Sequence, residues 1–139
     1  MRIPLLILAL AGLLVSSLAL RVHYQTGTQP CDINEHWDCG TVNHSSYSVV
    51  LGVPVAAIGI LGYLALAILA LTQHRFWHLA ASVAGFLFAL HLTNIESNVL
   101  MVWCLYCVIS QGIIALILLL SIIRLIAGIL ARRREEMQA

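Results

Sequence analysis

The stretch MVWCLYCVISQGIIALILLL, residues 101–120, places a Cys-x-x-Cys pair at the start of an apolar run long enough to cross a lipid bilayer. At a helix N-terminus, unpaired backbone N–H groups and the helix dipole stabilise a thiolate. A stabilised thiolate is a good leaving group and, at neutral pH, an available nucleophile. The stretch therefore predicts a membrane helix whose first turn carries two reactive thiols.

The composition places the rest of the chain in the membrane as well. Of 139 residues, 61% are hydrophobic and only 9% are charged, which is too little polar surface to cover a water-soluble globule. A bilayer core needs about 20 apolar residues per helix. We expect one all-α integral membrane domain over residues 1–139, a four-transmembrane-helix bundle with an external cysteine-bearing loop, or lid, at 21–53. Its four spans lie at about 3–20, 54–72, 76–93 and 104–130.

The arginines predict the orientation, because short cytoplasmic loops collect positive charge. With both termini in the cytoplasm, only Arg21 lies on the external side, and the other six arginines are cytoplasmic. A cleaved signal peptide is the alternative for residues 1–25, but its apolar region is usually about 7–15 residues long and the run 3–20 is longer. This topology puts all four cysteines on the external, disulfide-permissive side.

Three interpretations of the thiols remain open: structural disulfides, a metal site, and dithiol–disulfide exchange. Cys31 and Cys39 lie in PCDINEHWDCG (30–40), and Cys104 and Cys107 open the last span. A bridge between positions i and i+3 closes a small ring and constrains little chain. The neighbouring His36 and His44 could complete a thiolate and imidazole set, but the spacing matches no closed zinc pattern, and we assign no metal ligands. The clustering of two pairs at one membrane face favours exchange.

Such a pair needs an electron acceptor inside the membrane. The sequence contains no flavin or nicotinamide fingerprint, no Walker motif and no Cys-x-x-Cys-His, since Val108 follows Cys107. A lipid-soluble quinone needs no such motif, because it dissolves in the bilayer and can enter between helices.

Taken together, CDINEHWDC (31–39), GTVNHSSYSVVLGVPVAAIGILGY (40–63) and CLYC (104–107) resemble the vitamin K epoxide reductase family in its short bacterial form, over about residues 5–125. The most specific elements are the two loop cysteines eight positions apart, Ser45 six residues after the second, the Gly-Val-Pro at 52–54, and the final Cys-x-x-Cys. The DsbB family carries its Cys-x-x-Cys in the first external loop, so the arrangement here is the reverse.

The resemblance implies a four-helix bundle around a quinone of the ubiquinone, menaquinone or vitamin K type. Cys31 and Cys39 would be the shuttle pair that takes electrons from a separate thioredoxin-like or DsbA-like partner, in a bacterial inner membrane. Cys104 and Cys107 would be the active-site pair, with Cys107 nearest the quinone. We expect Cys39 to attack Cys104 and to release Cys107 as a thiolate. The resemblance leaves open whether an epoxide is also a substrate.

Several further residues are candidates for contact with the quinone. Vertebrate members of the family carry an asparagine and a tyrosine where this chain has Val55 and Gln111. Gln111 could bind the quinone or a neighbouring helix, and Ser45 could donate to a quinone carbonyl or cap a helix. Quinone reduction consumes two protons, which His91 or Glu96 could relay, although an interfacial location explains His91 equally well.

Overall fold

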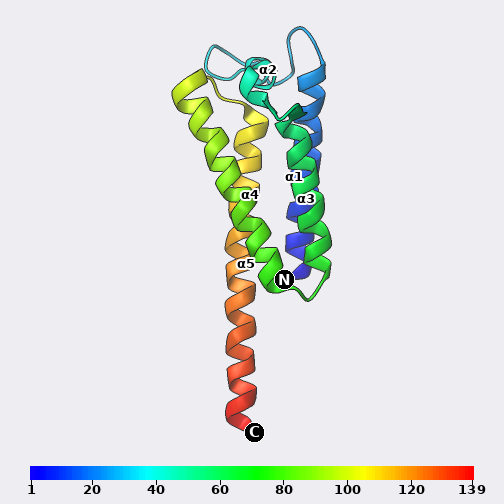
Figure 1. The fold of residues 1–139 in the computed structure, drawn as a ribbon, viewed down its shortest axis with the longest axis vertical. Coiled ribbons are helices and arrows are strands. Elements are labelled where there is room, and N and C mark those ends of the chain that lie inside the picture. The colour runs from blue at the N-terminus through cyan, green and yellow to red at the C-terminus, as the bar shows by residue number, and fades with distance from the viewer.

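The computed structural model describes residues 1–139, and most of them are helical (Figure 1). Four long helices make up the body of the molecule: α1 (Arg2–Tyr24), α3 (Val55–Leu71), α4 (Arg75–Ile95) and α5 (Leu105–Gln138). Helix α1 packs against α3 and α5, and α4 packs against α5 and α3. The N-terminus and the C-terminal part of α5 lie toward one end of the molecule, away from the cysteine loop.

The opposite end is closed by the segment that joins α1 to α3, residues 25–54, which we call the closing segment. It contains the short helix α2 (Cys39–His44), a 3₁₀ turn (Ser46–Ser48) and a hairpin of β1 (Val49–Val50) with β2 (Val53–Pro54). Leu51 and Gly52 connect the two strands with φ of 53° and 81°. Two consecutive left-handed residues are typical of the tightest hairpin turns, whose twist matches that of the strands. The expected external loop is therefore partly ordered into secondary structure, and Pro54 precedes the first residue of α3.

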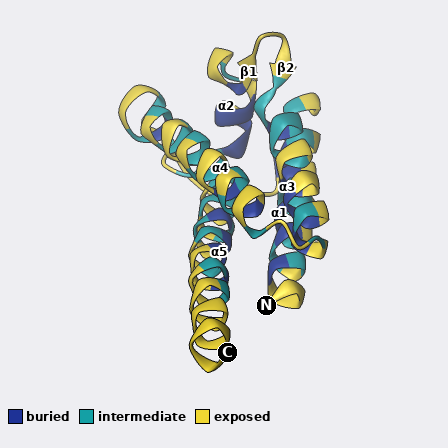
Figure 2. Ribbon diagram, turned by 60° about the horizontal axis from the view of Figure 1, so that its bottom comes forward, coloured by how far each residue is buried: buried dark blue, intermediate teal, exposed yellow.

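Three helices are long and apolar enough to cross a membrane: α1, α5, and α4 with its π-helical continuation η2 (Glu96–Leu100). Helix α3 is also apolar but has 17 residues. Buried residues lie where the helices meet, and exposed residues cover the outer faces (Figure 2). Those outer faces are rich in apolar side chains, such as Leu14 and Leu61. Length, composition and surface thus fit an integral membrane protein.

Polar side chains fasten α4 to α5 near the end that holds the termini. His78 Nδ1 lies 2.8 Å from Ser121 Oγ, and Ser82 Oγ lies 3.1 Å from the same oxygen. One turn farther along α5, Arg124 donates to the Thr72 carbonyl at 2.9 Å, which caps the end of α3. Side-chain hydrogen bonds therefore join α4 to α5 and α5 to the end of α3 here, while His78 Nε2 and Arg124 Nη1 are buried without a partner.

The apolar core between the helices depends on one close approach of α1 to α3. Gly12 is buried, and a methyl group added there would overlap the ring of Tyr63. Tyr63 belongs to the main core cluster, which contains Leu5, Ala9, Tyr63, Leu66, Ala67, Ala70, Ile114 and Ile117. The Tyr63 hydroxyl contacts α5, where it lies 2.8 Å from Ser110 Oγ and donates to the Ser110 carbonyl at 2.9 Å.

We expect Gly12→Ala to destabilise the bundle by about 1–3 kcal/mol, because the methyl group must displace the Tyr63 ring. The matched control is Gly112→Ala on α5, where nothing lies within 4 Å of the added carbon. Alanine is the better helix former by up to about 1 kcal/mol, so the control should be neutral or stabilising. Thermal unfolding in detergent measures both variants, and equal midpoints would contradict this account of α1–α3 packing.

Candidate functional site

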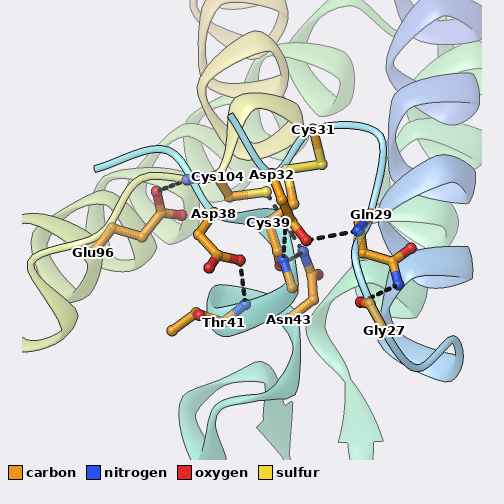
Figure 3. The surroundings of a disulfide bond; sticks show 11 residues. Gly27, Gln29, Cys31, Asp32, Asp38, Cys39, Thr41, Asn43, Glu96 and Cys104 are labelled. Carbon is orange, nitrogen blue, oxygen red and sulfur yellow. Dashed lines mark hydrogen bonds between the residues drawn. A yellow bond between two sulfur atoms is a disulfide. The ribbon is translucent and has the colours of Figure 1, made fainter. Parts of the chain in front are cut away.

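Cys31 and Cys39 form a disulfide at the start of the closing segment (Figure 3). Their Cα atoms are 5.8 Å apart, and both residues are buried. Asp38 is the N-cap of α2 and accepts the Thr41 N–H at 2.9 Å, so that α2 begins at Cys39. Capping by the residue before the cysteine thus fixes where one end of the disulfide sits.

Asp32 holds the two sides of the disulfide loop together. Its carboxylate accepts the Gln29 N–H at 2.6 Å and the Gly40 N–H at 3.0 Å. Desolvation alone would raise the pKa of Asp32, but these two backbone donors, with further hydrogen bonds from Asp38 and Cys39, lower it below the usual value. The ionised carboxylate is therefore the form that closes the loop.

The loop is attached to the start of α5 by backbone hydrogen bonds. Trp103 donates to the His36 carbonyl at 2.7 Å, and Asp38 donates to the Trp103 carbonyl at 2.9 Å. The rings of Trp37 and Trp103 lie beside each other, with centroids 6.4 Å apart. These contacts bring Cys39, at the start of α2, to Cys104, which is the N-cap of α5.

Asn43 contacts a residue of each cysteine pair. Its Nδ2 donates to the Cys39 carbonyl at 3.0 Å and lies 3.5 Å from the Cys104 sulfur, within hydrogen-bond reach. Cys31, Cys39 and Cys104 belong to one buried cluster, and Cys107 packs at its edge. Cys104 and Cys107 are free thiols. One disulfide and one dithiol therefore lie together, which is the arrangement that thiol–disulfide exchange requires.

A buried carboxyl group completes the site. Glu96 is 3% exposed, and its Oε2 accepts the backbone N–H of Cys104 at 3.2 Å (Figure 3). Glu96 is the first residue of the π-helical turn that continues α4, and the left-handed Met101 ends that turn. The carboxyl group thus contacts an otherwise unpaired N–H at the N-terminus of α5, where negative charge is favoured.

A cavity of about 390 Å³ lies between α1, α3, α4 and α5, and Cys107, Glu96 and Asn43 line it. Most of its other lining residues are apolar, and several are small, including Ala56, Gly59 and Gly85. A volume of this size lies in the range of small-molecule pockets. Cys107 of the dithiol therefore borders a hollow that could hold an apolar ring.

The other residues predicted to contact a quinone lie partly at the cavity and partly away from it. Val55 lines the cavity, and Ser45 lines a smaller hollow beside it while its hydroxyl donates to the Val42 carbonyl at 2.8 Å. Gln111 and His91 line neither hollow. Gln111 has a buried Oε1 without a hydrogen-bond partner, and His91 is exposed.

Sequence reasoning missed the role of Asn43 altogether, and named Glu96 only as one of two proton relays. Nothing in the residues around Asn43 marks it, because its contact with Cys104 spans 61 positions. Glu96 carried a signal, since it is an acid between apolar segments next to the Cys-x-x-Cys. The structure groups no three His, Cys, Asp or Glu side chains as metal ligands.

Asp32→Asn should weaken the closing segment by about 1 kcal/mol at pH 7, because its amide group presents an N–H₂ to one of the two N–H donors. The carboxylate contribution is complete above the unfolded pKa of about 3.9 and disappears as pH falls through the lowered folded value. The difference in unfolding temperature between the oxidised wild type and Asp32→Asn should therefore shrink from pH 7 to pH 3. The exposed Glu35→Gln is the control. A difference independent of pH would contradict the assigned hydrogen bonds.

Comparison with known proteins agrees with this geometry. The model of the Vitamin K epoxide reductase family matches residues 3–122, which include all four cysteines, Asn43 and Glu96. No curated protein matches the chain. Because the matched segment is most of the 139-residue sequence, the chain belongs to the vitamin K epoxide reductase family.

Proposed function

We propose that the protein is a membrane thiol:quinone oxidoreductase that moves electrons from a thioredoxin-like or DsbA-like partner, through two cysteine pairs, to a quinone. The observation that carries the proposal is one buried cluster in which a disulfide meets a dithiol at the wall of an apolar cavity. A disulfide that only braced a loop would need neither the second pair nor the cavity.

The electron path uses two exchange reactions. A partner thiolate attacks the Cys31–Cys39 disulfide, and the partner's second thiol completes its reduction. The Cys39 thiolate then attacks the Cys104–Cys107 disulfide at Cys104 and displaces Cys107 as a thiolate, after which Cys31 attacks Cys39 and restores the first disulfide. The cysteine states in the structure, one disulfide and one dithiol, are those that follow this exchange.

The cavity suits a quinone by size and character. A bound quinone would supply an acceptor for two electrons and two protons. Cys107 would face it from α5, Val55 and Gly59 would contact it from α3, and Ser45 would lie close by. Oxidation of Cys104 and Cys107 to a disulfide releases two electrons and two protons, so the two sides balance. Ubiquinone, menaquinone and vitamin K are the candidates, and contacts from Gln111 and His91 remain predictions.

We further propose that α3 also spans the membrane, which makes four spans. Seventeen residues of α-helix extend about 25 Å, close to the thickness of the hydrocarbon core. The placement of the chain termini away from α2 supports a topology with both termini in the cytoplasm and the cysteines in the periplasm of a bacterial inner membrane (Figure 1). That compartment permits disulfides.

Oxidation of dithiols by the purified protein with added quinone tests the function. Wild type should oxidise both a reduced DsbA-type protein and dithiothreitol, with quinone reduction followed by absorbance. Cys107→Ser should lose both reactions. Cys31→Ser should lose oxidation of the protein donor but keep part of the dithiothreitol reaction, because a small dithiol can reach the inner pair directly.

Two outcomes would contradict this scheme. No turnover by wild type with ubiquinone, menaquinone or vitamin K would favour disulfides that only brace the closing segment. Equal loss with both donors in Cys31→Ser would make Cys31 structural rather than the entry point for electrons.

A further inference from the structure

Glu96 is a carboxyl group buried beside the dithiol without a cation. The residues that line its cavity and the adjoining hollow include no arginine, lysine or histidine. The ionisable groups that share these hollows with it are Cys107, Tyr47, Tyr63 and Tyr106. A buried carboxylate without a partner charge is costly, so a chain that needed only a helix cap would be served by a neutral side chain.

Glu96 lies between the backbone of Cys104 and the cavity that Cys107 lines. Its Oε2 accepts the backbone N–H of Cys104, and Glu96 also lines the smaller hollow together with Cys107. It lines the same cavity as Cys107. A proton could therefore pass from a thiol to this carboxyl group, and from it to a molecule in the cavity, without crossing bulk water.

We propose that Glu96 is the proton carrier of the dithiol oxidation, an inference that rests on the proposed function. The Glu96 carboxylate takes the Cys107 proton as the thiolate forms, and the resulting carboxylic acid gives that proton to an oxygen of the acceptor. The Cys104 proton follows the same route while the Cys104–Cys107 bond closes. Two electrons and two protons leave the dithiol, two of each reach the acceptor, and Glu96 returns to its starting state.

Proton transfer to Glu96 also keeps the charge of the site constant. When a proton moves from Cys107 to the carboxylate, one negative charge changes place within the cavity. If the proton left for water instead, a thiolate and a carboxylate would stand side by side in low-dielectric surroundings, which is unfavourable. The exposed His91 lines neither hollow, and the Tyr63 hydroxyl is engaged by Ser110, so neither occupies an equivalent position.

The first measurement is quinone-dependent turnover by the full chain in detergent. Glu96→Gln keeps an oxygen that can accept the Cys104 N–H but cannot carry a proton. We expect its kcat to fall about 100-fold or more, the usual size of general acid–base catalysis. Glu96→Asp should recover part of the rate, and the exposed Glu35→Gln should match wild type. Thermal unfolding should be similar for all four proteins.

The second measurement needs no quinone. The rate at which a neutral maleimide alkylates Cys107 in the fully reduced protein is followed against pH by mass spectrometry. Wild type should show a pH-independent shoulder near neutrality, because the proton can pass from thiol to carboxylate internally. In Glu96→Gln the alkylation rate should lack this shoulder and fall tenfold for each unit that the pH is lowered. Glu96→Asp should show a smaller shoulder. Should Glu96→Gln not fold, the profiles of wild type and Glu96→Asp decide.

Wild-type turnover and an unchanged profile in Glu96→Gln would overturn the proposal and leave Glu96 a helix cap. Loss of turnover in Glu96→Gln with a wild-type alkylation profile would also overturn it, since a structural role alone predicts that result. Absence of turnover in the wild type would instead contradict the proposed function, and the alkylation profiles would still decide whether Glu96 exchanges a proton with Cys107.

Discussion

The attachment of the disulfide loop to the N-terminal end of α5 is the constraint on which the site depends. Two backbone hydrogen bonds between the loop and Trp103, and the side chain of Asn43, hold Cys39 and Cys104 in one buried cluster. Without them, the two pairs would belong to separate elements with no reason to meet. The same attachment covers Cys104 and leaves Cys107 toward the cavity, which gives the two thiols of one Cys-x-x-Cys different surroundings.

The apolar runs of the sequence nearly coincide with helices of the structure. The spans expected at 54–72 and 76–93 correspond to the helices Val55–Leu71 and Arg75–Ile95. The largest difference is at the end of the chain, where the expected span stops near 130 but α5 continues to Gln138. Hydropathy marks where apolar residues end, whereas arginine, glutamate, methionine and glutamine are good helix formers that continue the helix beyond the apolar run.

The contacts inside the site were harder to predict, for a physical reason. Gln111 follows Cys107 by one turn, which suggested a shared face, yet only Cys107 lines the cavity. The rotation of a helix about its axis is set by packing against its neighbours, and sequence spacing alone leaves it open. Asn43 lies 61 positions from Cys104 in the sequence, and Glu96 lies on the π-helical turn that follows α4, so their contacts with Cys104 depend on how these elements pack.

The central claim is that electrons pass from Cys39 to Cys104 and leave through Cys107. The most direct measurement is the disulfide pattern of Cys107→Ser with its Cys31–Cys39 disulfide intact and no reductant added, read by non-reducing digestion and mass spectrometry. In this variant the Cys104 thiolate can attack Cys39 and displace Cys31 as a thiolate, which is the exchange run in reverse. Without the Cys107 thiol to resolve it, the bond between Cys39 and Cys104 should accumulate, and trapping it would require Cα atoms within about 7 Å. A bond from Cys31 or Cys39 to Cys107 in Cys104→Ser, with quinone turnover retained, would contradict the account and place Cys104 beside the acceptor.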